Sequence, residues 1–119
     1  MDKVNLAECF ARFADHWSPK VVGQVDDYEI KLVKIEGEFV WHKHDDADEM
    51  FLVVEGRLRI RLRDRDVALE AGEFFVVPRG IEHCPAAEAE CQMLLFERQG
   101  VINTGDVEDE RTVRQPERL

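Results

Sequence analysis

The stretch GEFVWHKHDDADEMFLVVEG, residues 37–56, contains two histidines separated by a single residue and a glutamate that opens an apolar run. We expect a strand over 38–44, in which successive side chains point to opposite faces. His42 and His44 then share one face with Val40, a residue expected to point into the core. The two imidazoles are therefore predicted to lie near-buried on the same side, where their ring nitrogens need partners.

Glu49 strengthens this prediction. On the next expected strand it shares a face with Phe51 and Val53. A carboxylate on an apolar face is costly unless something compensates its charge. A divalent cation bound by the two histidines and Glu49 would compensate it, so a metal site is favoured over a pair of ordinary core histidines.

A further candidate ligand lies in GEFFVVPRGIEHCP, residues 72–85. Pro78 and Gly80 predict a turn, and His83 lies on the strand that returns from it. The remaining histidine, His16, is interpreted as a surface or interface residue. The aspartates of the opening stretch are interpreted as a solvent-exposed turn: Asp45, Asp46 and Asp48.

The fold class follows from the spacing of apolar residues and turn signals. From Val21 onward the period is two, and Gly, Pro and Asp interrupt the chain every eight to twelve residues, which is typical of an antiparallel β-sandwich or barrel. Before it, apolar residues recur every three or four positions and predict a short amphipathic helix over about 5–15. Strands are expected near 20–25, 28–35, 38–44, 49–54, 57–63, 66–70, 73–77, 81–86 and 89–97.

Size and charge narrow the class of protein. A chain of 119 residues is expected to build one hydrophobic core. Its net charge of −10 disfavours nucleic acid and anionic membranes as partners. Apolar runs are too short to span a membrane and the first residues are charged, so we expect a cytoplasmic protein. The three cysteines are interpreted as buried or idle thiols.

The chain is expected to divide into three segments. Residues 1–18 form an N-terminal helical segment, and residues 19–98 form the β-barrel. Residues 99–119 carry many charges and scattered small apolar residues. They predict an extended or partly disordered tail whose start is anchored by Val101 and Ile102.

The stretch RLRIRLRDRD, residues 57–66, predicts the clearest strand. Its leucines and isoleucine face one way, and four arginines, Arg57, Arg59, Arg61 and Arg63, face the other. The favoured interpretation is that the arginines are solvated and pair with carboxylates on neighbouring strands. The alternative is a subunit contact or a docking surface for an anionic partner.

These motifs resemble those of the cupin superfamily. Residues 37–56 match the first cupin motif, G-x4-H-x-H-x4-E-x6-G, and residues 72–83 match the second, G-x5-P-x-G-x2-H. The spacing from Gly37 to His42 is one residue shorter than is usual in that family. Ala87 stands where the second motif commonly ends in asparagine.

The resemblance implies a small single-domain cupin, with an antiparallel double-stranded β-helix, or jelly-roll barrel, and a short N-terminal helix. It also implies that His42, His44, Glu49 and His83 bind one divalent transition metal. Three imidazoles and one carboxylate leave positions for water or substrate, as an open site requires. The donor set suits iron, manganese, nickel, zinc or copper and does not choose among them.

Three functions are consistent with such a site. The leading hypothesis is a small-molecule enzyme of dioxygenase or isomerase type, and the alternative is a binding or sensing module without turnover. In a third interpretation the cation only stabilises the barrel.

No second titratable group is predicted beside the ligands, and the sequence names no catalytic residue. The expected wall of the substrate pocket is apolar and favours a compact hydrophobic substrate: Val40, Phe51, Val53, Leu58 and Ile60.

The oligomeric state is predicted from the other face of the 38–44 strand. Phe39 and Trp41 would be exposed on an isolated barrel, and large apolar patches mark partner surfaces. We therefore expect a homodimer. The alternative is that the N-terminal helix covers these residues within one chain.

Overall fold

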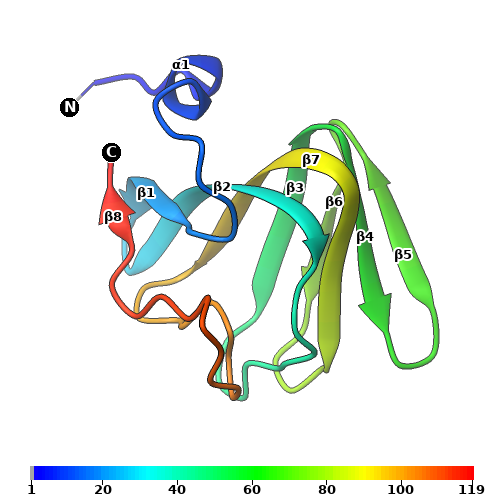
Figure 1. Ribbon diagram of the computed structural model, residues 1–119. Helices are drawn as coiled ribbons and strands as arrows, with labels where there is room; N and C mark the ends of the chain where they lie inside the picture. Colours follow the sequence, from blue (N-terminus) through cyan, green and yellow to red (C-terminus); the bar gives the residue numbers. More distant parts are fainter. Residues whose placement is uncertain (1) are drawn as a thin grey trace.

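A single bent strand, β7 (His83–Arg98), pairs with three other strands of the barrel. The structure is a computed structural model and describes residues 2–119. One edge of β7 pairs with β2 (Tyr28–Glu38). The other pairs first with β4 (Arg57–Leu62) and then with β3 (Glu49–Glu55). β7 therefore belongs to both walls of the barrel, as its long curved course in Figure 1 shows.

The remaining elements complete the two walls. β4 pairs with β5 (Asp66–Glu70), and β3 pairs with β6 (Phe74–Val77). β2 pairs with β1 (Lys20–Val25), whose other edge takes the short parallel strand β8 (Glu117–Arg118). Every pairing except that of β8 is antiparallel, which confirms the all-β jelly-roll class with a short N-terminal helix.

Alternating side chains of these strands fill the barrel. On β3, Glu49, Phe51 and Val53 are buried while the residues between them are half-buried, which is the period-two pattern of a strand with one face in a core. The same pattern holds on β4, where Leu58 and Ile60 are buried and the arginines lie outside. The core therefore lies between the walls, and the metal-ligand candidates lie at one end of it.

Several expected strand boundaries were wrong. Residues 38–44 do not form a strand: after β2 the chain runs as a loop to Glu49, with one isolated bridge between His42 and His83. The strands expected at 81–86 and 89–97 are one strand, β7. A loop over 39–48 allows the two histidines to turn inward without the strict alternation of a strand.

The N-terminal helix is shorter than expected. α1 (Leu6–Phe10) begins at Asn5, whose side chain accepts a hydrogen bond from the Glu8 backbone N–H at 3.0 Å, as an N-cap does. It does not continue to residue 15. The carbonyl of Phe13 instead accepts a 2.7 Å hydrogen bond from the Lys34 ammonium on the sheet, so a tertiary contact takes the place of another helical turn.

The expectation that Phe39 is exposed was also wrong. The residue is 8% exposed, and its ring stacks on Trp17 with ring centroids 4.6 Å apart. The Arg111 guanidinium lies 4.8 Å from the Phe39 centroid. Trp41 is half-buried, and the guanidinium of Arg63 lies 3.8 Å from its ring centroid. Segments outside the barrel thus cover Phe39 within one chain.

The C-terminal segment packs on the barrel, contrary to the expectation of a partly disordered tail. Thr104 is fully buried and its hydroxyl lies 2.8 Å from that of Thr112. The Asn103 side chain accepts a hydrogen bond from the Val113 N–H at 2.7 Å and donates to the Arg111 carbonyl at 2.9 Å. Side-chain hydrogen bonds help to fix the segment, and hydropathy does not reveal such bonds. In Figure 1 it runs in orange and red across the end of the barrel to β8.

None of the helices within residues 2–119 combines the length and apolar character needed to cross a bilayer.

Candidate metal centre

Four predicted ligands meet at one end of the barrel. His42 and His44 lie on the loop after β2, Glu49 begins β3 and His83 begins β7. All four side chains are buried, and one ligand atom from each lies within 4.8 Å of the other three. Three separate segments of the chain therefore present a compact set of nitrogen and oxygen donors.

Backbone hydrogen bonds join the histidine-bearing segments. The His42 N–H donates to the His83 carbonyl at 3.0 Å, and the His83 N–H donates to the His42 carbonyl at 2.9 Å. The Gly80 N–H donates to the His44 carbonyl at 2.8 Å. Gly80 has φ of +80°, a conformation that glycine adopts without strain. The Pro78–Gly80 turn thereby holds the loop of the first motif against the second.

The rings of His42 and His83 are oriented by carbonyl groups. Nδ1 of His42 lies 2.9 Å from the Val40 carbonyl oxygen, and Nδ1 of His83 lies 2.9 Å from that of Ile81. A carbonyl only accepts, so each neutral ring carries its proton on Nδ1 and leaves Nε2 as a lone pair. Burial, together with the nearby His83, lowers the pKa of His42 to about 4. The ring is thus neutral near pH 7, the form that binds metals.

The donor atoms face one another without hydrogen-bond partners. Glu49 Oε1 lies 3.3 Å from His44 Nε2 and 3.4 Å from His83 Nε2. These three atoms are buried and make no hydrogen bond within the described chain. Burial opposes ionisation of Glu49, but its contacts with His44 and His83 hold its pKa well below its usual range. A carboxylate and two imidazole nitrogens without these hydrogen bonds are costly to bury unless a cation lies between them.

This donor set fits a divalent transition metal. Imidazole with carboxylate suits iron, manganese, nickel, zinc and copper. The carbonyl acceptors behind His42 and His83 are the outer partners that fix ligand rings in metal sites. The structure therefore brings together four residues that could hold a divalent metal.

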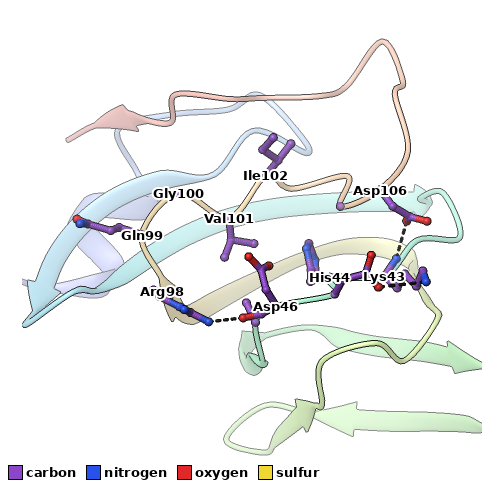
Figure 2. Close-up of a pocket in the computed structure, with 12 residues that line it drawn as sticks. Lys43, His44, Asp46, Arg98, Gln99, Gly100, Val101, Ile102 and Asp106 are labelled. Carbon is purple, nitrogen blue, oxygen red and sulfur yellow. Dashed lines mark hydrogen bonds and ion pairs between the residues drawn. The ribbon is translucent and has the colours of Figure 1, made fainter.

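Two spaces border the ligand cluster. One is a small apolar cavity of about 30 Å³ inside the barrel, next to His42 and Glu49. The other is a surface hollow of about 560 Å³ between the loop of His44 and the segment after Arg98. Figure 2 shows His44 beside Val101 and Ile102 in this hollow.

The expected pocket residues lie in different places. Of these, Phe51 lines the inner cavity. Val53, Leu58 and Ile60 are buried in the main core cluster, and Val40 is half-buried and presents its carbonyl to His42. The cavity wall comes mainly from residues that the sequence did not single out for this role, among them Trp17, Val33, Ile35, Phe39, Met93 and Leu95.

A buried ion pair lies beside the centre and was not predicted, and the expectation of no second titratable group there was wrong. Glu97 lies directly across from Glu49 in the β3–β7 register and is 2% exposed. Its Oε1 accepts a 3.0 Å hydrogen bond from the ammonium of Lys31, which is 1% exposed. Burial and the charge of Glu49 raise the pKa of Glu97 well above its usual range. The signal was present in the alternation of Cys91, Met93 and Leu95, which continues to Glu97 on the inward face.

Other predicted polar residues lie outside the centre. His16 contacts Glu90 at 3.0 Å on the exposed surface, as expected for a residue that is not a ligand. Asp45 and Asp46 are exposed, and Asp48 bonds to the Arg79 backbone and guanidinium. The aspartates thus form the turn that the sequence predicted.

The three arginines of β4 and Arg63 just after it all pair with carboxylates, as the favoured interpretation predicted, although only Arg57 and Arg59 pair with the neighbouring strand β5. Their partners are Glu70 for Arg57, Asp66 for Arg59, Glu38 for Arg61 and Glu82 for Arg63. Pairs this exposed add little stability.

Comparison with known proteins identifies the family. The family model for the cupin domain matches residues 30–97, a span that contains the ligand candidates. The chain belongs to the cupin family. This agrees with the fold and with the two motifs read from the sequence.

The chain is also similar to a solved cupin structure and to curated proteins. A cupin-2 domain containing protein from Shewanella frigidimarina is 49% identical, with a TM-score of 0.80 over 81% of this chain and 94% of that one. An uncharacterised protein of Bacillus subtilis, YdbB, is 38% identical over 52% of this chain and 56% of its own length. A 3-hydroxyanthranilate 3,4-dioxygenase of Xanthomonas euvesicatoria is 29% identical over 70% of this chain and 49% of its own. The chain spans about half the length of the curated relatives it matches.

Proposed function

We propose that this cupin is a metal-dependent enzyme of small molecules, of dioxygenase type in preference to isomerase type. The observation that carries the proposal is the set of buried donor atoms for a metal on Glu49, His44 and His83, which face one another and make no hydrogen bonds with residues 2–119. The similarity to a 3-hydroxyanthranilate 3,4-dioxygenase over 87 residues supports the oxidative type. The runner-up is a binding or sensing module with the same centre and no turnover.

His42, His44, Glu49 and His83 would hold the metal. When bound, a divalent metal supplies open coordination positions at which a small oxygen-bearing molecule and a co-substrate meet. The chain's own groups orient the ligands through the Val40 and Ile81 carbonyls.

The walls of the inner cavity favour a compact, largely apolar substrate over a sugar. Trp17, Phe39 and Phe51 line it, and it offers few polar groups. At about 30 Å³ the cavity is far smaller than the roughly 300–1,000 Å³ of a pocket that encloses a small molecule. A substrate body would therefore extend from the centre toward Trp17 or into the hollow beside His44.

Elemental analysis of the purified protein tests the metal centre. Near-stoichiometric metal is expected in the parent and in His16→Ala, because His16 lies on the surface. A large loss is expected in His42→Ala and Glu49→Ala. Equal metal content in all four proteins would refute the site, and retained metal in His16→Ala excludes a nonspecific histidine effect.

Turnover separates the enzyme from the binding module. Oxygen consumption and product formation are measured on the metal-loaded protein with a panel of phenols, small diketones, thiols and sugar phosphates. Consumption of dioxygen with a phenol or diketone supports the dioxygenase type, and conversion of a sugar phosphate supports the isomerase type. Saturable binding without reaction would instead support the module.

We also propose a homodimer, supported by a different surface from the one first expected. Phe74 on β6 is 63% exposed and Val76 beside it is 44% exposed. In the β3–β6 register they lie opposite Leu52 and Met50, so apolar side chains continue across the outer face. Light scattering should give the mass of two chains, and Phe74→Lys should give the mass of one. A parent with the mass of one chain would refute the dimer.

A further inference from the structure

A gain in fold stability does not explain why the ion pair Lys31–Glu97 is buried. The ammonium and carboxyl groups are 3.0 Å apart and almost completely shielded from water. Taking both charges out of water usually costs as much as their attraction returns, and apolar residues of similar volume often serve equally well. We therefore infer the role of the pair from the residues that it contacts.

Glu97 and Glu49 are direct cross-strand neighbours. They are paired residues in the antiparallel register of β3 and β7, and both point into the barrel. Side chains so placed lie about 5 Å apart at their Cβ atoms, and like charges in this position repel. Oε1 of Glu97 is bonded to Lys31, whereas its Oε2 has no hydrogen-bond partner in residues 2–119.

Lys31 contacts Glu97 with its ammonium group at 3.0 Å. It also lies 3.7 Å from Glu29, which is in turn 3.3 Å from the guanidinium of Arg118. The Glu29 contact gives the ammonium a second fixed partner. Lys31 is thus held in place from β2 while it restrains Glu97 on β7.

We propose that Lys31 and Glu97 are positioning residues for the ligand Glu49. Lys31 fixes the rotation of the Glu97 carboxyl group, and Glu97 in turn limits where the neighbouring Glu49 carboxylate can turn, so that Glu49 stays directed at His44 and His83. The pair restrains Glu49 through the cross-strand contact of Glu97, whereas the Val40 and Ile81 carbonyls orient their imidazoles by hydrogen bonds. Loss of an outer partner of this kind lowers metal affinity about 10- to 100-fold. The inference rests on the metal centre of the proposed function.

Cobalt titration of four proteins tests it. Co²⁺ affinity is measured by competition with a chromophoric chelator, and the visible absorption of bound Co²⁺ reports the ligand set. The parent is expected to bind one Co²⁺. Lys31→Met and Glu97→Leu are expected to bind it about 10- to 100-fold more weakly, with a changed absorption band. Glu97→Gln keeps the shape and can still contact both neighbours, so its affinity is expected to stay within about threefold of the parent.

The double variant Lys31→Met/Glu97→Leu separates positioning from stability. It removes both buried charges, so its melting temperature is expected to equal or exceed that of the parent. Its Co²⁺ affinity is nevertheless expected to remain low. A double variant with parental affinity and spectrum would overturn the positioning role, as would single variants with parental affinity. A parent that binds no Co²⁺ would overturn the metal centre itself.

Discussion

His42 and His83 are joined by two reciprocal backbone hydrogen bonds, 3.0 Å and 2.9 Å long, and their ring centroids lie 4.3 Å apart. This bridge connects the loop of the first cupin motif to the strand of the second. Both hydrogen bonds join backbone atoms. They therefore hold positions 42 and 83 side by side independently of which side chains stand there. The metal centre therefore rests on the fold, and a bound metal should in turn stabilise the fold.

Metal should raise the melting temperature of the parent and not of His83→Gln. A ligand that binds only the folded state adds about 2.7 kcal/mol to the free energy of unfolding at 100 times its Kd. Glutamine keeps much of the volume of the histidine but removes one of the four donors. Thermal unfolding with added Zn²⁺ or with a chelator measures the difference. An equal shift in both proteins would show that the metal binds elsewhere.

The metal-free protein should lose stability as the pH falls from about 6.5 to about 4. Burial lowers the pKa of His42 from 6.5 to about 4, so over this range the unfolded chain binds the proton more readily than the folded one. The contribution is complete above pH 6.5 and decreases by roughly 3 kcal/mol on acidification through the range. Denaturant unfolding of the parent and of His42→Gln at several pH values isolates it. Parallel pH dependences in the two proteins would contradict this assignment.

The sequence predicted the ligand set because its members lie in two short motifs. His42, His44 and Glu49 fall within eight residues. The predicted turn at Pro78–Gly80 indicated that His83 lies on the strand that returns from it. The conformation of the segment that carries His42 and His44 was not predicted, because the H-x-H spacing is compatible with both a strand and a loop. What places the histidines is the contact of that loop with β7 and with the 78–80 turn, and this contact joins residues far apart in the chain.

Lys31 and Glu97 were missed for a related reason. Each interrupts an apolar alternation on its own strand, but a charged residue near the end of a strand usually reaches solvent. Only the joint register of β2, β7 and β3 shows that Lys31, Glu97 and Glu49 lie on adjacent strands inside the barrel. The packing of the segment after Gln99 was missed as well, because side-chain hydrogen bonds such as those of Asn103 leave no periodic pattern.

Two of the three cysteines should resist thiol reagents in the folded protein. Burial raises the pKa of both Cys84 and Cys91 to about 11, and both side chains are fully shielded. Only the thiolate reacts. A colorimetric thiol assay near pH 8 should therefore titrate Cys9 alone at first, and all three thiols after denaturation. Rapid reaction of more than one thiol in the folded state would contradict the packing described for β7.

Variants that fill either space beside the centre should show which one receives the substrate. Val33 lines the inner cavity and Val101 lines the outer hollow. Val33→Phe is expected to raise KM or abolish binding if the inner cavity is used, at a cost of about 1–3 kcal/mol in stability. Val101→Trp is expected to raise KM or abolish substrate binding if the outer hollow is used. Metal content serves as the control, because neither substitution removes a ligand.

Gly105 should be required for the loop that carries His42. With φ of +59°, it passes so close to that loop that an added Cβ would overlap the Lys43 carbonyl oxygen and lie 3.1 Å from Cδ2 of His42. Gly105→Ala is therefore expected to displace the loop, to lower metal affinity and to lower the melting temperature. Metal titration and thermal unfolding measure the two effects.

The control for this substitution is Gly100→Ala. Gly100 also has a positive φ, of +88°, but an added Cβ there has nothing within 4 Å. It should cost about 1 kcal/mol for backbone strain alone and leave metal affinity unchanged. Gly105→Ala should cost about 1–3 kcal/mol more because of the overlap. If both variants bound metal equally well, the C-terminal segment would play no part in holding the first motif in place.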